Sequence, residues 1–200
     1  MTSGDTQSWD TQWLLAINQS FASNWGDLLF PWLSSVGGFS IPLLGLLCLW
    51  LSLRNKSHGW KLALLLIGVI ISADLLGNLL KLLFSQARPC GSLAEVMRSV
   101  QYSHFQACPG NSSGMPSNHA MNFFTLAGLL LFWFRAHPVS ISVFLIACMV
   151  GLSRIYLGKH FPSQVFAGAA FGFFYGWLIA KICDQHLIFA NRHKLLNPND

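Results

Sequence analysis

The sequence predicts an all-α polytopic membrane bundle with about five or six transmembrane helices. Hydrophobic residues make up 53% of the 200 residues and charged residues only 10%, whereas a soluble domain has about 25% charged residues. The apolar residues gather in long runs between short polar turns. Because a helix needs about 20 apolar residues to cross a bilayer, such runs predict spanning helices. We expect one membrane-embedded domain over 1–200.

The N-terminal stretch 1–35 has a different pattern. Trp13, Leu14, Ile17 and Phe21 recur at helical spacing, but several polar residues and tryptophans interrupt them. Helices with one apolar and one polar face lie in the plane of the membrane interface, and tryptophan is enriched at that level. We therefore expect amphipathic helices there. A sixth crossing in this stretch is the alternative.

Five apolar runs follow, and each has roughly the 18 to 25 residues that a spanning helix needs. They are Val36–Leu53, Trp60–Phe84, Ser117–Phe134, Val139–Leu157 and Pro162–Cys183. We therefore expect a transmembrane core over 36–183 and a cytoplasmic tail over 184–200. The long polar insertion 85–115 separates the second run from the third.

The lysines and arginines predict the orientation of these spans. Seven lie on one side of the expected membrane: Arg54, Lys56, Lys61, Arg135, Lys181, Arg192 and Lys194. Five lie on the other: Lys81, Arg88, Arg98, Arg154 and Lys159. Cytoplasmic loops carry the excess of basic residues, so the side with five is expected to be extracytoplasmic (periplasmic), across the inner (plasma) membrane. Topology and the site below account for the net charge of +5 without a nucleic acid partner.

Three motifs lie at span ends on this extracytoplasmic side. They are Lys81-x6-Arg88-Pro89, Pro116-Ser117-Asn118-His119 and Ser153-Arg154-x5-His160-x3-Gln164. A single basic residue at a helix end usually just extends to the lipid headgroups. The order and spacing of the three motifs, taken together, favour an anion-binding site instead. Ser117 before an apolar run is typical of a helix N-cap, whose free N–H groups bind anions, and Lys and Arg add charge-assisted hydrogen bonds to phosphate.

The motifs resemble those of the type 2 phosphatidic acid phosphatase superfamily over about residues 36 to 183. The resemblance implies a phosphate clamp made of Lys81, Arg88, Ser117, Asn118 and Arg154. It further implies that His160 is the nucleophile and that His119 is the general acid.

Two positions depart from the family pattern. Asn118 stands where the family usually has glycine, and asparagine tolerates unusual backbone conformations well. Gln164 stands where the family has the aspartate that orients the nucleophilic histidine. The amide oxygen of Gln164 is able to accept the imidazole proton, so we include Gln164 with His160 and His119 in the catalytic set.

The chemistry of such a site follows from its residue types. A neutral imidazole attacks phosphorus, the cations stabilise the charge on the equatorial oxygens, and the second histidine protonates the leaving oxygen. Water then cleaves the phosphohistidine. We expect no metal and no other cofactor, because three cations supply the electrostatic stabilisation that a metal would supply.

The substrate is expected to be a lipid phosphate or diphosphate. The short chain and compact loops resemble bacterial enzymes that act on polyprenyl diphosphates, such as the undecaprenyl carrier of wall synthesis. Phosphatidylglycerol phosphate, phosphatidic acid and lipid A phosphates stay open as substrates. A lipid phosphotransferase is the alternative enzyme. A catalytically impaired protein that binds or transports lipid phosphates is the alternative from another class.

The cysteines and one acidic residue complete the predictions. Cys90 and Cys108 lie in the loop expected outside, where thiols are oxidised, and we predict a disulfide between them. With His104 they form an alternative zinc site. Asp74, Asn78 and Lys81 share one face of the second span, so Asp74 is either functional or a hydrogen-bonding residue within the bundle. The remaining cysteines are expected to be free: Cys48, Cys148 and Cys183.

Overall fold

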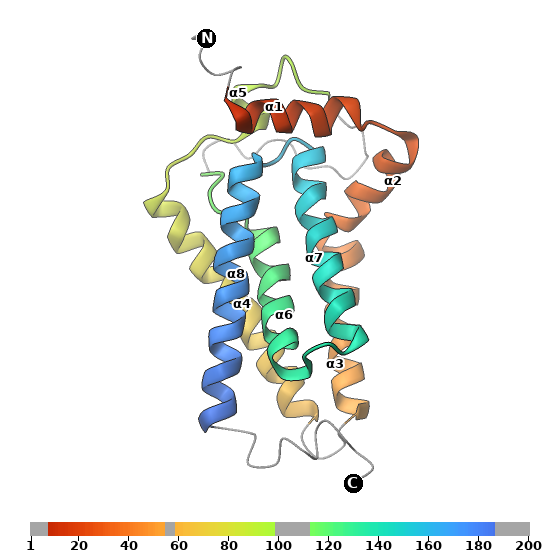
Figure 1. The fold of residues 1–200 in the computed structure, drawn as a ribbon, viewed down its shortest axis with the longest axis vertical. Coiled ribbons are helices and arrows are strands. Elements are labelled where there is room, and N and C mark those ends of the chain that lie inside the picture. The colour runs from red at the N-terminus through yellow and green to blue at the C-terminus, as the bar shows by residue number, and fades with distance from the viewer. Residues whose placement is uncertain (1–7, 55–58, 99–112, 187–200) are drawn as a thin grey trace.

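The computed structural model describes residues 8–54, 59–98 and 113–186, and the regular structure in these ranges is helical. Long helices run side by side, and short helices lie across one end of the bundle (Figure 1). The elements are α1 (Trp9–Leu15), η1 (Ala16–Ser20), α2 (Asn24–Leu33), η2 (Val36–Ser40), α3 (Ile41–Arg54), α4 (Gly59–Leu83), α5 (Pro89–Ser92), α6 (Asn118–Phe134), α7 (Pro138–Tyr156) and α8 (Pro162–His186).

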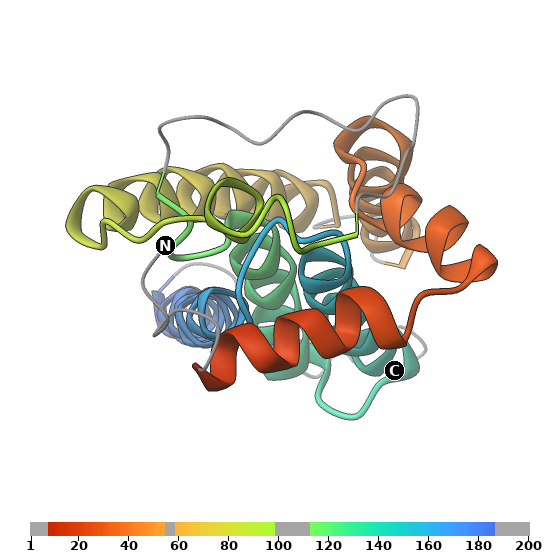
Figure 2. The ribbon, with the colours of Figure 1, turned by 90° about the horizontal axis from the view of Figure 1, so that it is seen from above.

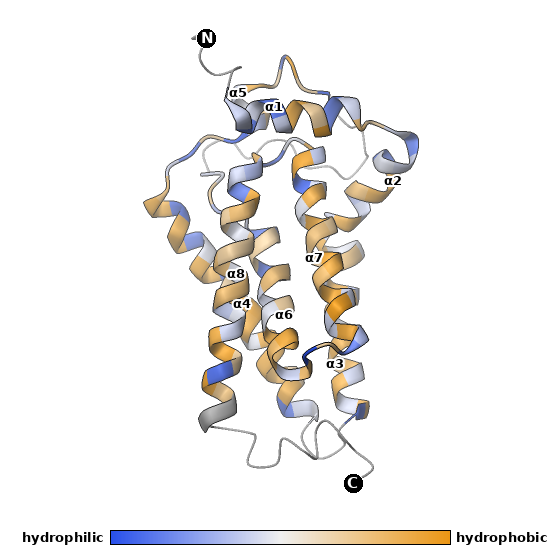
Figure 3. Cartoon of the chain, in the orientation of Figure 1, coloured by the Kyte–Doolittle hydropathy of each residue, from blue (hydrophilic) through white to orange (hydrophobic). Residues whose placement is uncertain are grey.

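The predicted helical membrane bundle is confirmed. Within the described residues, four helices are long and apolar enough to cross a membrane by length and composition: Val36–Arg54, Gly59–Leu83, Pro138–Tyr156 and Pro162–Cys183. The other predicted span, α6, has 17 residues, which is the lower limit for a crossing. It packs against α4, α7 and α8 at the centre of the bundle. Figure 3 shows that apolar residues dominate the long helices, while polar residues are frequent in the segments across one end.

The N-terminal region forms two short helices. Ser8 caps α1 and Ser23 caps α2, because each hydroxyl accepts a hydrogen bond from a backbone N–H of the first turn. With seven and ten residues, these helices are too short to cross a bilayer. In both views α1 lies across the end of the bundle, and α2 runs obliquely from this end along α7 (Figures 1 and 2). The structure therefore agrees with short helices at this end and not with a sixth crossing between residues 8 and 35.

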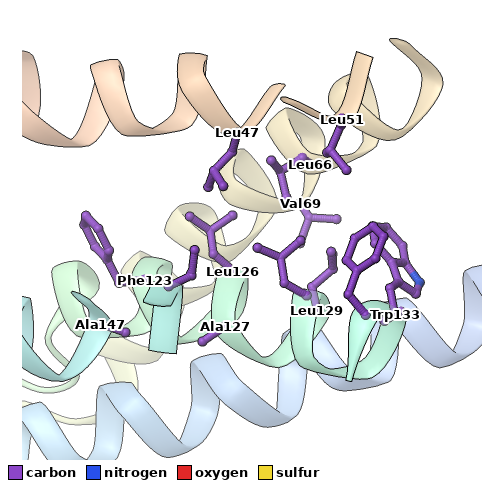
Figure 4. Close-up of a cluster of buried hydrophobic side chains, with 14 of the residues drawn as sticks. Leu47, Leu51, Leu66, Val69, Phe123, Leu126, Ala127, Leu129, Trp133 and Ala147 are labelled. Carbon is purple, nitrogen blue, oxygen red and sulfur yellow. The ribbon is translucent and has the colours of Figure 1, made fainter. Parts of the chain in front are cut away.

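The core of the bundle lies where α3, α4, α6 and α7 meet. Leu66, Leu129, Leu130 and Val150 are fully buried there, and Figure 4 shows side chains of α3, α4 and α6 pointing toward one another. Burial of one such side chain stabilises a water-soluble fold by about 1.5–3 kcal/mol. Inside a membrane, close packing supplies most of the stabilisation instead.

Helices α6 and α8 pack closely together, and glycines make this possible. A Cβ added to Gly168, Gly172 or Gly176 of α8 would lie 2.1–2.5 Å from a backbone oxygen of α6 or its N-cap. The two backbones therefore touch along the helix pair, as small residues permit in membrane helices. This contact fixes the start of α6 against the start of α8, where two of the motifs lie.

Hydrogen bonds fasten the N-terminal region to the bundle. Asp10 of α1 accepts from the backbone N and the hydroxyl of Ser163 at 2.8 and 2.5 Å. Asp27 of α2 pairs with Arg98 through two 2.8 Å contacts and accepts from the Tyr156 hydroxyl at 2.6 Å. The hydrogen bonds from Arg98 hold the pKa of Asp27 below its usual range. The short helices are thus tied to the ends of α7 and α8.

The cysteines follow the prediction where the structure describes them. Cys90 is disulfide-bonded, and Cys48, Cys148 and Cys183 are free. The predicted partner Cys108 and the predicted zinc ligand His104 lie outside the described residues, as does most of the predicted tail 184–200. A disulfide sulfur is not the thiolate that zinc binds, so the alternative zinc site loses Cys90.

Candidate active site

The three motifs meet at one end of the bundle. Lys81 lies in the last turn of α4, Arg88 directly precedes α5, and Arg154 lies in the last turn of α7. His119 lies in the first turn of α6, and His160 in the turn between α7 and α8. These five side chains, together with Asn118, line one pocket of about 650 Å³. Residues up to 79 positions apart in the sequence thus share one cavity.

The loop that carries His160 is held by its own backbone. Gly158 adopts a positive φ of 64°, a conformation that side chains disfavour. The backbone N–H groups of Lys159 and His160 then donate to the carbonyl oxygen of Arg154 at 3.0 and 3.2 Å. As a result, His160 is only 2% exposed and lies beside the arginine of its own motif.

Hydrogen bonds fix the tautomer of His160. Its Nδ1 lies 2.8 Å from the carbonyl oxygen of Gly114 and 3.1 Å from Oε1 of Gln164. A carbonyl oxygen only accepts hydrogen bonds, so Nδ1 carries the proton and Nε2 keeps its lone pair. Nε2 lies 3.2 Å from a terminal nitrogen of Arg88. Burial first, and the charges of Arg154 and Arg88 second, hold the pKa of His160 well below its usual range.

Gln164 connects all three motifs. Its Oε1 accepts from the backbone N of Phe161 at 3.2 Å, which sets the orientation of the amide independently of His160. Its Nε2 donates to the Ala87 carbonyl at 2.8 Å and to Oε1 of Gln86 at 3.1 Å. Its backbone oxygen accepts from the Ser117 N–H at 3.0 Å. The amide that replaces the aspartate expected from the family pattern is therefore fully used, and it is fully buried.

The second histidine is held by a residue that the sequence did not predict. Nε2 of His119 lies 3.2 Å from the carbonyl oxygen of Ser34, so Nε2 carries the proton. The hydroxyl of Ser34 is hydrogen-bonded by a terminal nitrogen of Arg154. No motif marks Ser34 in the sequence, because both contacts depend on how α2 and η2 fold over the end of the bundle.

Two buried polar atoms in the clamp have no partner among the described residues. They are the hydroxyl oxygen of Ser117, at the N-cap of α6, and Nε of Arg154. An unpaired buried polar group costs about 1–3 kcal/mol. Because burial also lowers the pKa of Arg88, a bound anion would offset the cost of holding these cations together.

The other departure from the family pattern, Asn118, holds the lysine. Nζ of Lys81 donates to Oδ1 of Asn118 at 2.6 Å. Nδ2 of Asn118 donates to Asp74 at 3.1 Å and to Asn78 at 2.8 Å. A Cβ on Gly77 would lie 2.7 Å from Asn118 Oδ1, so Gly77 provides the space that the amide occupies. Asp74, predicted as functional or structural, is thus linked to Lys81 through Asn118.

The pocket continues from these polar residues into an apolar groove. Its further lining comes from η2, α3, α4 and α6, and includes Val36, Ile41, Leu44, Ile71, Leu75 and Leu126. Figure 1 shows that α4 leans away from the bundle toward its C-terminal end. Leu75 is 61% exposed and Ile71 is 57% exposed on this helix, so the groove is open on the side that would face lipid.

Comparisons with known proteins agree on one family. A family model described as the PAP2 superfamily matches residues 62–187. The chain is 30% identical over 181 residues to the lipid A 4'-phosphatase of Bacteroides thetaiotaomicron, covering 88% of this chain and 77% of that protein. It is 29% identical over 173 residues to the putative undecaprenyl-diphosphatase YbjG of Escherichia coli, covering 82% and 78%. The solved PAP2-type phosphatidylglycerolphosphate phosphatase of Bacillus subtilis has a TM-score of 0.64 at 23% identity, covering 92% and 91%, and so has the same fold.

Proposed function

The chain belongs to the PAP2 superfamily, and we propose that it removes a phosphate from a membrane lipid through a phosphohistidine intermediate. The observation that carries the proposal is the single pocket that holds His160, His119 and three cations and then continues into an apolar groove. A phosphate in the polar part and a hydrocarbon chain in the groove would be bound together, which suits a lipid at the membrane surface.

The proposed reaction begins at Nε2 of His160. Its lone pair forms the N–P bond while the bond from phosphorus to the lipid oxygen breaks. Lys81, Arg88 and Arg154 stabilise the charge on the remaining phosphate oxygens. His119 enters this step doubly protonated, keeps its Nε2–H on the Ser34 carbonyl, and gives its Nδ1 proton to the leaving oxygen. In the second step His119 takes a proton from water, the water oxygen bonds to phosphorus, and the N–P bond breaks. Phosphate is released, and the free imidazole of His160 is regenerated.

Gln164 and Gly114 share the task of orienting the nucleophile in this proposal. Both oxygens lie within hydrogen-bonding distance of Nδ1, and the carbonyl of Gly114 is the nearer at 2.8 Å. The imidazole becomes positive as the N–P bond forms, and an amide oxygen stabilises that charge less than a carboxylate would. The arrangement thus keeps the required tautomer without an acidic partner at position 164.

Two substrate classes follow from the relatives and from the groove. Undecaprenyl diphosphate is the substrate expected from the compact chain. A phosphorylated lipid A is the other, since a lipid A 4'-phosphatase is among the relatives. In both cases the site would act on the extracytoplasmic face, which the distribution of Lys and Arg favours, and no metal would be required.

Phosphate release by the purified protein tests the proposal. We expect turnover on at least one lipid of a panel containing undecaprenyl diphosphate, lipid A and phosphatidylglycerol phosphate. Turnover should persist in EDTA, and radiolabelled phosphate should be trapped on the protein but not on His160→Ala. Binding without any turnover would favour a binding or transport protein, and transfer of the label to an added lipid would favour a phosphotransferase.

Cysteine labelling in intact cells tests the orientation. Single cysteines placed at Ser85 and at Arg135 lie at opposite ends of the bundle. We expect an impermeant reagent to label the first and not the second. Labelling of position 135 alone would place the site on the cytoplasmic face.

A further inference from the structure

Four polar side chains meet where α4 and α6 pack together. We call Asp74, Asn78, Asn118 and Asn122 the polar wall. Oδ1 of Asp74 accepts from Nδ2 of both Asn118 and Asn122, each at 3.1 Å, and Oδ2 accepts from Nδ2 of Asn78 at 3.2 Å. Three of the four, Asp74, Asn118 and Asn122, line the same pocket as His160. Figure 2 shows α4 and α6 side by side.

The polar wall extends from the phosphate clamp toward the middle of the membrane. Asp74 precedes Lys81 by seven residues on α4, which is about 10 Å along the helix at 1.5 Å per residue. Asn122 lies one turn after Asn118 on α6. A lipid whose phosphate is held at Lys81 and His160 would therefore pass the polar wall with atoms up to about 10 Å from its phosphorus.

Part of the hydrogen-bonding capacity of this wall is unused. Oδ1 of Asn122 is buried and has no partner among the described residues. A buried acceptor without a donor is unfavourable, and such atoms are rare in folded proteins. An ionisable residue at membrane depth, such as Asp74, is also expensive to keep unless it has a function. Asn122 lines the pocket, so a turn of its side chain toward the pocket would let a hydroxyl or an amide N–H of a bound lipid supply the missing donor.

The two substrate classes differ at this depth. A polyprenyl diphosphate has only hydrocarbon beyond its diphosphate, so it would cover the polar wall without satisfying it, which is unfavourable. A phosphorylated sugar lipid has hydroxyl, amide and ester groups between its phosphate and its chains. We propose that the polar wall selects a lipid of this second kind, a phosphorylated sugar lipid. The inference rests on the proposed function and specifies its substrate class.

Selectivity among three lipids tests this proposal. The substrates are lipid A, phosphatidylglycerol phosphate and undecaprenyl diphosphate, and the measured quantity is kcat/KM for phosphate release in mixed micelles. We expect the wild type to prefer lipid A over undecaprenyl diphosphate by at least about ten-fold, since a site that hydrogen-bonds its substrate discriminates against an analogue without the partner groups. Asn122→Leu should lower kcat/KM for lipid A and leave undecaprenyl diphosphate unchanged or improved.

Two further variants separate selection from folding. Asn78 is exposed on α4, so Asn78→Leu is expected to fold and to shift the preference in the same direction, by a smaller factor. Leu75→Ala alters the apolar lining of the same groove and should affect the three lipids alike.

Each outcome of the test is informative. An equal loss on all three lipids in Asn122→Leu and Asn78→Leu would mean that the wall only supports the clamp, which overturns the proposal. A wild type that prefers undecaprenyl diphosphate would overturn it as well, while leaving the lipid phosphatase function intact. A preference for phosphatidylglycerol phosphate would assign the wall to a glycerol-based headgroup and contradict the sugar lipid. Hydrolysis of none of the three would contradict the proposed function itself.

Discussion

The side chains of His160 and Gln164 differ from those of the polar wall in how completely their hydrogen bonds are made. On the nucleophile side, His160 and Gln164 are 2% and 0% exposed, and the polar atoms of both side chains have protein partners. On the groove side, Asp74 and Asn122 are half-buried, and Oδ1 of Asn122 has no partner among the described residues. This difference fits two different roles for the two sides. In the proposed function, the nucleophile would be held by the protein, while the groove side would keep hydrogen-bonding groups for the lipid.

The largest effect is expected from removing the nucleophile. His160→Ala should lower kcat by a factor on the order of 10⁴ or more for every lipid, as removal of a catalytic nucleophile does in other enzymes. Single-turnover rates would measure it, with thermal unfolding as a check on folding. His137→Ala changes a histidine at the opposite end of the bundle and should leave the rate unchanged. Retained turnover in His160→Ala would show that His160 is not the nucleophile, and the comparison of a nucleophile side with a groove side would then be wrong.

A smaller effect is expected at Gln164, because the carbonyl of Gly114 also orients the nucleophile. Gln164→Leu keeps the volume but leaves the Ala87 carbonyl without its donor. That unpaired carbonyl should lower the stability by about 1–3 kcal/mol. We expect kcat to fall by about ten-fold, because one of the two acceptors near Nδ1 of His160 is lost and one hydrogen bond contributes about 1 kcal/mol. The ratio of rates on different lipids should not change. Gln164→Glu is the companion variant: its second oxygen would face the carbonyl oxygen of Ala87, so it should also be slower than wild type.

The dependence of kcat/KM on pH should reflect the pKa of His160, which burial and the charges of Arg154 and Arg88 lower. His160 reacts when neutral, and a lowered pKa keeps it neutral at more acidic pH. The acidic limb of the profile, where His160 becomes protonated, should therefore lie below pH 6.5, which is the ordinary pKa of a histidine side chain. Arg88→Gln removes one of the charges that lower this pKa, so its acidic limb should move to higher pH. A limb that stays in place in Arg88→Gln would show that another group controls it.

The sequence predicted the helices well because membrane spans depend on local composition. The predicted run Val139–Leu157 corresponds to α7 at Pro138–Tyr156, and Ser117–Phe134 to α6 at Asn118–Phe134. Each motif lies at a span end and the spans alternate in direction, so the order of the spans indicates that the motifs share one end of the bundle. These features follow from hydrophobic length and from the order of the spans.

Contacts between distant segments could not be predicted in this way. Ser34 contacts His119 and Arg154 across 85 and 120 positions, and these contacts depend on the folding of α2 over the bundle. The role of Gln164 was also hidden, because the sequence shows a missing carboxylate but not the carbonyl of Gly114 that supplies a second acceptor. A linear pattern marks the residues of a motif and not the backbone groups that surround them.

Asn118 joins the two sides, and its replacement should have a moderate effect. Asn118→Gly restores the residue usual in the family and removes the acceptor that holds Lys81 at 2.6 Å. With Lys81 less well positioned, we expect KM to rise by about three- to ten-fold, equivalent to about 1 kcal/mol for one hydrogen bond, and kcat to change less. Initial-rate kinetics would measure both. A fall in kcat with an unchanged KM would place Asn118 with the nucleophile instead.

The smallest effect is expected away from both sides, at the ion pair that ties α2 to the polar segment before residue 99. Asp27→Asn should lower the free energy of unfolding by about 1 kcal/mol or less, since the side chains of Asp27 and Arg98 are 34% and 30% exposed and exposed pairs contribute little. The hydrogen bonds from Arg98 lower the pKa of Asp27, so its contribution is present above the ordinary pKa of about 4 and is lost as pH falls through the folded value. The difference in thermal stability between wild type and Asp27→Asn should therefore be visible at pH 7 and shrink in acid.

Rates and lipid preference should stay as in wild type, because Asp27 contacts neither side of the pocket. A change in lipid preference in Asp27→Asn would mean that the short N-terminal helices also take part in selecting the substrate.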